Sequence, residues 1–153
     1  MRSFTDSLYQ IAVTLWVGGL WAIGFIAAPV LFAYLEDRTL AGALAGRAFS
    51  VVAWVGIACA AYLIVFLLAR RGWRAVKSSV FWIVLFMLGM TVAGHFGIQP
   101  ILAELKAQAV PREVMESVVR SRFATWHGVA SGLYLAQSLL GVALVVIQGR
   151  GLR

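Results

Sequence analysis

Long stretches without charge divide the chain into four apolar segments joined by short charged connectors. The uncharged stretches hold 29, 22, 26 and 27 residues, and we predict helices over about 8–34, 48–69, 78–103 and 123–148. A helix needs roughly 20 residues to cross a bilayer core about 30 Å thick. Four such helices in a soluble protein would need a much larger chain to cover them. The pattern therefore predicts an all-α, integral membrane four-helix bundle.

Composition agrees with this pattern and limits the class of protein. Hydrophobic residues make up 62% of the 153 residues and charged residues only 12%, against about 25% charged in soluble domains. This length accommodates one transmembrane domain over residues 1–153, with the lipid bilayer as its expected partner. We expect no nucleic-acid binding despite the net charge of +7, because the basic residues lie in short loops beside the spans.

The distribution of these basic residues predicts the orientation of the chain. With four spans, both termini and the loop at 70–77 lie on one side of the membrane. That side holds seven basic residues and one acidic residue, whereas the other side holds six basic and five acidic residues. Since basic loops favour the cytoplasm, we expect a multi-pass protein of the bacterial inner (plasma) membrane with both termini cytoplasmic.

The connectors between the spans carry their own predictions. Residues 36–47 combine both charge signs with the small residues AGALAG, and we expect a short amphipathic turn of helix at the interface. Pro29 is expected to kink the last turns of the first span. Pro111, followed by Glu113 and Glu116, predicts the start of a helix that continues into the fourth span.

Two segments of the chain resemble each other without a gap. WVGIACAAYL at 54–63 and WHGVASGLYL at 126–135 share Trp, Gly, Ala, Tyr and Leu at the same places. At an offset of 71, a second set of matches pairs Gly18, Ala22, Phe25 and Pro29 with Gly89, Ala93, Phe96 and Pro100. These matches predict an internal repeat, with two duplicated helical hairpins related by an axis along the membrane normal.

Polar side chains within the spans gather in the second copy, which alone has histidines. At helical spacing they form one face of the third span and one of the fourth: Thr91, His95 and Gln99, then His127, Ser131, Tyr134 and Ser138. Polar groups in hydrocarbon are costly unless partnered, so both faces should point into the bundle. All of these residues except Ser138 form a candidate ligand-binding pocket for an unknown small molecule.

The two histidines leave three interpretations open. His95 lies nine residues before Glu104 and His127 five residues after Arg122, so their depths should differ by roughly 6 Å. They could be structural, could line a small polar pocket, or could bind a shared metal ion or a bis-histidine haem b. Two histidines without cysteine, methionine or carboxylate neighbours are weak evidence for a metal site.

Glycines at helical intervals predict close-packing surfaces between helices. They lie on the fourth, third and second spans: Gly128 and Gly132, Gly89 and Gly97, and Gly56. Such surfaces could serve contacts within the chain or a homo-oligomer.

Several segments resemble the transmembrane protein 205-like family, whose bacterial members are classed as domain of unknown function 4149. They are LWVGGL at 15–20, APVLF at 28–32, LAG with GRAF at 40–49, HFGIQPILAEL at 95–105 and RFATWHGVASGLYL at 122–135. The likeness covers nearly the whole chain, and its most specific part is the Trp-His-Gly segment. It implies a small four-helix membrane protein with His127 as the family histidine and with no settled activity. The animal relative is associated with resistance to platinum drugs, which implies handling of small molecules or metals.

The chemistry of the spans disfavours an enzyme. No carboxylate lies within a span, and the chain has no nucleotide-binding loop, hydrolase elbow or zinc motif. We therefore hypothesise a non-enzymatic scaffold, or a handler of small hydrophobic or metal-bearing molecules, with a polar notch on spans three and four. Two alternatives stay open: a bis-histidine haem or metal-binding redox protein, and a homodimerising membrane assembly factor.

Overall fold

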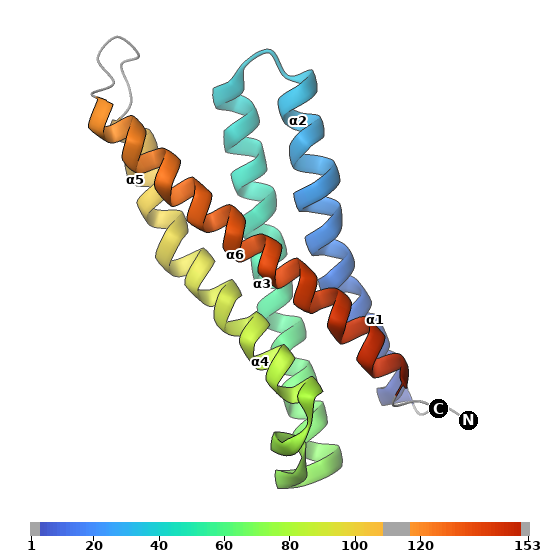
Figure 1. The fold of residues 1–153 in the computed structure, drawn as a ribbon. Helices are drawn as coiled ribbons and strands as arrows, with labels where there is room; N and C mark the ends of the chain where they lie inside the picture. Colours follow the sequence, from blue (N-terminus) through green and yellow to red (C-terminus); the bar gives the residue numbers. More distant parts are fainter. Residues whose placement is uncertain (1–3, 109–116, 151–153) are drawn as a thin grey trace.

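The computed structural model describes residues 4–108 and 117–150, and these residues form long helices joined by short turns. The elements in order are α1 (Phe4–Trp21), η1 (Ala22–Ala27), α2 (Ala28–Tyr34), α3 (Arg38–Arg71), η2 (Gly72–Lys77), α4 (Ser79–Val92), η3 (Ala93–Ile98), α5 (Gln99–Gln108) and α6 (Ser117–Arg150). They combine into four helical segments that are long and apolar enough to cross a membrane. The predicted all-α four-helix bundle is confirmed (Figure 1). The predicted helix start at Pro111 lies outside the described residues.

The helices extend beyond the predicted spans, because the charged ends continue the same helical segments. α3 begins at Arg38, where the Asp37 carboxylate accepts hydrogen bonds from the N–H groups of Thr39 and Leu40 at 2.8 and 3.3 Å. Residues 38–47 are helical, but they continue into the second span as one helix, α3, instead of forming a short turn of their own. This N-cap starts the helix at once, and the small residues that follow contain no breaker.

The chain reverses near its termini through a short 3₁₀ turn, η2. Gly72 permits the reversal because its φ of 53° lies in the left-handed region. Ser78 then caps α4 by accepting a hydrogen bond from the N–H of Phe81 at 3.3 Å. An ion pair between Arg70 and Asp6 joins the end of α3 to the start of α1.

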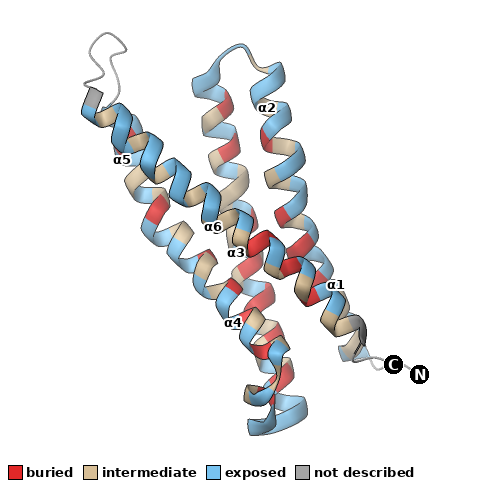
Figure 2. Cartoon of the chain, in the orientation of Figure 1, coloured by how far each residue is buried: buried red, intermediate tan, exposed pale blue. Residues whose placement is uncertain are grey.

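The core fills the half of the bundle that contains the termini (Figure 2). Its fully buried side chains come from all four helical segments: Val13, Trp16, Leu63, Val84, Met87 and Leu144. Gly56 allows α3 to approach α1, since a Cβ atom at Gly56 would lie 2.5 Å from the indole nitrogen of Trp16. This half of the molecule holds the two hairpins together.

The other predicted packing glycines have no neighbouring helix at Cβ distance within residues 4–108 and 117–150. A Cβ atom added at Gly128, Gly132, Gly89 or Gly97 would meet nothing within 4 Å among the described residues. Their helix faces are exposed, so these four glycines do not bring two helices together within the described part of the chain. Whether they pack against a second copy stays a prediction.

Two π-helical turns interrupt the first and third spans, η1 and η3. At their ends, the N–H of Ala28 donates to the carbonyl of Ile23, and the N–H of Gln99 donates to that of Gly94. Each turn comes just before a proline, Pro29 or Pro100, which lacks the N–H that would close a regular helical bond. The break expected at Pro29 therefore takes the form of a widened turn on its N-terminal side.

The hairpins separate toward the end opposite the termini. In Figure 1, α2 and the first turns of α3 lean away from α5 and the first half of α6. Buried residues become sparse in this direction (Figure 2). The candidate site lies in this part of the molecule.

Candidate functional site

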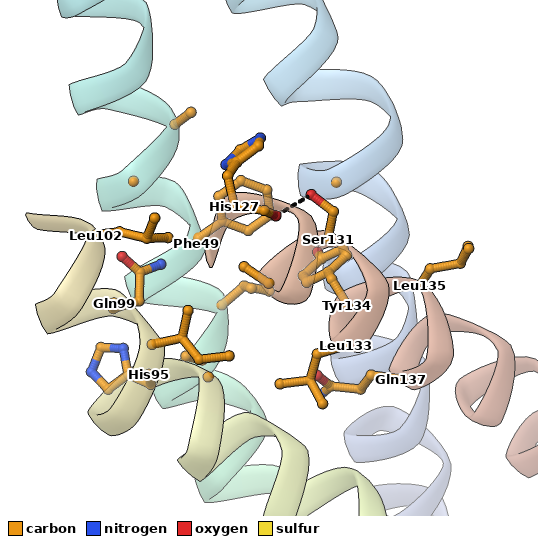
Figure 3. Close-up of a pocket in the computed structure, with 18 of the residues that line it drawn as sticks. Phe49, His95, Gln99, Leu102, His127, Ser131, Leu133, Tyr134, Leu135 and Gln137 are labelled. Carbon is orange, nitrogen blue, oxygen red and sulfur yellow. Dashed lines mark hydrogen bonds between the residues drawn. The ribbon is translucent and has the colours of Figure 1, made fainter. Parts of the chain in front are cut away.

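A cavity of about 580 Å³ lies between the two hairpins and is lined by residues from all four helical segments. This volume is within the range of about 300–1,000 Å³ that is typical of small-molecule sites. Small residues leave much of the space open, among them Gly42, Ala45, Gly46 and Ala53. The side chains of the wall are drawn in Figure 3.

All six residues of the predicted pocket line this cavity. They are Thr91, His95 and Gln99 from the third span and His127, Ser131 and Tyr134 from the fourth. The structure thus brings together two polar faces that are far apart in the sequence. That they bind a ligand stays a prediction.

A buried hydrogen bond between α4 and α6 forms the cavity wall nearest the termini. The amide nitrogen of Gln137 donates to the hydroxyl of Thr91 at 2.6 Å, and this hydroxyl donates to the carbonyl of Met87 at 2.9 Å. Thr91 and Gln137 are only 6% and 5% exposed. The sequence analysis missed Gln137, although an amide in mid-span was a signal, because such a group needs a partner in hydrocarbon.

Tyr134 joins α6 to the first hairpin. Its hydroxyl donates to the carbonyl of Leu20 at 2.6 Å. Its ring lies so close to Gly24 that a Cβ atom there would be 2.3 Å from the ring. The Tyr134 ring also meets the Phe49 ring edge-on, with the ring centroids 5.1 Å apart. Tyr134 therefore fixes the angle between the hairpins beside η1.

The two histidines occupy different environments. His95 is half-buried, and its ring meets Trp54 edge-on at a centroid distance of 5.6 Å. Its Nδ1 atom is buried and has no hydrogen-bond partner among the described residues. His127 is exposed and stacks on Phe123 with the ring centroids 5.8 Å apart. The Ser131 hydroxyl donates to the carbonyl of His127 at 2.9 Å, so it bonds within its own helix.

Figure 3 shows the two imidazole rings well separated, with Gln99 and Leu102 between them in this view. The rings do not point toward each other. A shared metal ion would need a nitrogen of each ring about 2 Å from one point. No group of three or more metal-ligating residues occurs among the residues that the structure describes. A shared metal or haem stays a prediction that this arrangement does not favour.

Two basic residues, Arg38 and Lys106, stand at the end of the cavity that lies away from the termini. Arg38 is the first residue of α3, and Lys106 is in the last turn of α5. The Lys106 ammonium group lies 3.7 Å from the position of a Cβ atom at Gly42, one helical turn beyond Arg38. None of the described lining residues is acidic. In the sequence both residues contributed only to the predicted orientation, and neither was predicted to line a cavity.

The chain matches a known protein family. The model of a family described as a domain of unknown function (DUF4149) matches residues 11–111. The chain belongs to this family. The match ends before the Trp-His-Gly segment at 126–128, which the sequence analysis took as its most specific part. The link to transmembrane protein 205-like proteins stays a prediction.

Searches of curated proteins and of solved structures gave no match. The DUF4149 description gives no activity for the family. The four apolar helices identify this family member as a multi-pass membrane protein. Any more specific function has to come from the cavity itself.

Proposed function

We propose that this DUF4149 protein is a non-enzymatic membrane protein that holds a small hydrophobic molecule between its two hairpins. The observation that carries the proposal is the cavity of about 580 Å³, whose wall is mainly apolar. Its polar groups are few. They are the Thr91–Gln137 pair, Gln99, the two histidines, the hydroxyls of Tyr134 and Ser131, and the two cations at one end, Arg38 and Lys106. Apolar walls with a few placed polar groups are typical of ligand sites.

The hydrogen bonds of the hydroxyl groups in the wall support binding over catalysis. Thr91, Tyr134 and Ser131 all donate their hydroxyl hydrogens to backbone carbonyls. A nucleophilic hydroxyl needs a neighbouring base, and none of these three has one among the described contacts. Their hydrogen bonds fix the shape of the wall, which suits a protein that holds a molecule without changing it.

The proposal is tested by filling the cavity. Gly46 lines the cavity, and a Cβ atom there would meet nothing within 4 Å. Gly46→Phe therefore adds a ring at the cavity wall from a position where the Cβ atom has open space. It also removes a glycine, which is about 1 kcal/mol less favourable in a helix than alanine. In detergent, the purified protein should bind the neutral fluorescent probe N-phenyl-1-naphthylamine, and Gly46→Phe should reduce this binding at least about tenfold.

Gly89→Phe is the matched control. Gly89 is exposed, meets nothing within 4 Å and does not line the cavity, so this variant should bind the probe like the unmodified protein. Equal binding by the unmodified protein and Gly46→Phe would refute the proposal. So would a lack of probe binding by folded, unmodified protein.

We also propose that the wide end of the cavity faces the periplasm, in the inner membrane of a bacterium. The basic loop at η2 and both termini lie at the opposite end (Figure 1). Basic loops favour the cytoplasm, which supports this orientation.

A further inference from the structure

We infer that the cavity receives one acyl chain of an anionic membrane lipid, whose acidic headgroup binds between Arg38 and Lys106. This inference rests on the proposed function and specifies the class of molecule that is held. Three features carry it: the charge at one end of the cavity, the length of the apolar wall and its opening toward lipid.

The charged residues that line the wide end are both basic, and they come from both hairpins. Arg38 and Gly42 are four residues apart and share one face of α3, and Lys106 of α5 reaches the same place from the opposite wall. Neither basic residue forms an ion pair within the part of the chain that the structure describes. Two cations at one opening attract an anion, and phosphate accepts hydrogen bonds from arginine in bidentate geometry.

The neighbouring acids lie outside the described wall of the cavity. Asp37 precedes Arg38, but its carboxylate accepts hydrogen bonds from the N–H groups at the start of α3. Glu104 accepts a hydrogen bond from Gln108 at 3.3 Å. Neither of these acids, nor Glu36, is among the described residues that line the cavity.

The apolar wall below these cations is as long as a lipid chain. On α3 the wall runs from Arg38 to Ala53, and on the third span from Lys106 down to Thr91. Each run contains 16 residues and extends about 22 Å along a helix. One leaflet of a bilayer core about 30 Å thick is about 15 Å deep, so the cavity accommodates an acyl chain of that leaflet.

Exposed apolar side chains show where such a chain would enter. Phe25 and Leu135 line the cavity and are still 43% and 50% exposed, so the cavity opens between the first and fourth spans. Both residues lie within apolar helices, where the surroundings are lipid. A two-chain lipid can therefore place one chain inside and leave the other in the bilayer. The Thr91–Gln137 hydrogen bond closes the far end without needing a polar ligand.

The experiment compares two lipids with identical chains and different headgroups. The purified protein is offered palmitoyl-oleoyl phosphatidylglycerol and palmitoyl-oleoyl phosphatidylcholine in equal amounts, and bound lipid is counted by native mass spectrometry. The unmodified protein should retain the anionic phosphatidylglycerol selectively. Each cation near an anionic headgroup raises the affinity for that lipid about fivefold. The double variant Arg38→Gln with Lys106→Gln should therefore reduce the selectivity by about 25-fold.

Arg47→Gln is the matched control, because Arg47 is an exposed arginine of the same helix and does not line the cavity. It should keep the selectivity for phosphatidylglycerol. Gly46→Phe should lose retained lipid of both kinds. The double variant should still bind N-phenyl-1-naphthylamine, which has no charge.

The outcomes separate the inference from the proposed function. Equal retention of the two lipids by a protein that binds the neutral probe would overturn the inference and leave the proposed function standing. Equal losses of selectivity in Arg47→Gln and in the double variant would also overturn it, because the charge would then act from outside the cavity. Failure of the probe to bind would remove the proposed function as well.

Discussion

Gln137 and Thr91 make a direct side-chain hydrogen bond between the two helices of the second hairpin. Both groups are buried, and the Thr91 hydroxyl also donates to Met87. In membranes such bonds contribute less than their burial suggests, about 0.6 kcal/mol on average and at most about 1.7. The reason is that a polar group in the unfolded membrane state also finds partners.

A double-mutant cycle measures this bond. Gln137→Leu, Thr91→Val and the double variant should each unfold at lower denaturant than the unmodified protein. The coupling between the two sites should be about 0.5–1.7 kcal/mol. Unfolding in mixed detergent and sodium dodecyl sulfate, followed by tryptophan fluorescence, gives the four free energies. A coupling near zero would mean that the hydrogen bond does not stabilise the fold.

Gly56 and Gly46 lie on the same helix and should respond in opposite directions to alanine. At Gly56 the new methyl group would lie 2.5 Å from the indole nitrogen of Trp16, which is completely buried. Gly56→Ala should therefore destabilise the protein by about 1–3 kcal/mol through overpacking. Gly46→Ala enters open space and should stabilise it by up to about 1 kcal/mol through helix propensity. The same unfolding assay compares them, and equal effects would contradict the packing of α1 on α3.

The start of α3 depends on one side chain. Asp37 accepts hydrogen bonds from two N–H groups of the first turn, and this turn also positions Arg38 at the cavity. Asp37→Ala should lower the free energy of unfolding by about 1 kcal/mol, whereas Asp37→Asn should keep most of it, because asparagine is an equally good N-cap. Chemical unfolding of the two variants decides this, and an asparagine variant as unstable as the alanine variant would rule out a capping role.

The helical elements follow from the sequence because each depends on local signals. Uncharged stretches of sufficient length predict the spans, and the structure confirms four of them. The π turns could not be predicted from Pro29 and Pro100 alone, because proline removes a hydrogen bond without dictating how the helix adapts. The two turns, Ala22–Ala27 and Ala93–Ile98, lie at the same offset of 71 as the matches between the halves. The internal repeat stays a prediction, and this correspondence supports it.

The candidate site was predictable only in part, for a physical reason. Helical spacing places His95 with Thr91, and His127 with Ser131, on two faces whose cost in hydrocarbon directs them inward. Spacing does not reveal how far the hairpins separate, so the open end of the cavity and the part played by Lys106 needed the structure. Nor does it distinguish Gly56, which meets Trp16, from Gly128, which faces outward.

At the scale of the whole molecule, orientation decides which leaflet can reach the cavity. Cys59 is the only cysteine, so Cys59→Ala provides a background for single reporter cysteines. In intact cells, Thr39→Cys should react with a membrane-impermeant maleimide, and Trp73→Cys should react only after the cells are opened. Both positions are exposed at helix ends, on opposite sides of the bundle. The reverse pattern would place the cavity opening on the cytoplasmic side.

The outward glycines of the fourth span give the last prediction, which concerns assembly. Gly128 and Gly132 are four residues apart on one exposed face of α6, and a Cβ atom at either would meet no described residue within 4 Å. Small residues at this spacing let two membrane helices approach closely. If the face joins two copies, Gly128→Leu and Gly132→Leu should convert dimers to monomers in analytical ultracentrifugation in detergent. Gly18→Leu places the same side chain on an exposed glycine of α1, and His127→Ala removes the neighbouring imidazole, so both should leave the dimer intact. A monomeric unmodified protein would exclude this face as an interface. Dimers that persist in both leucine variants would exclude it too, because a leucine at a close helix crossing cannot be accommodated without separating the backbones.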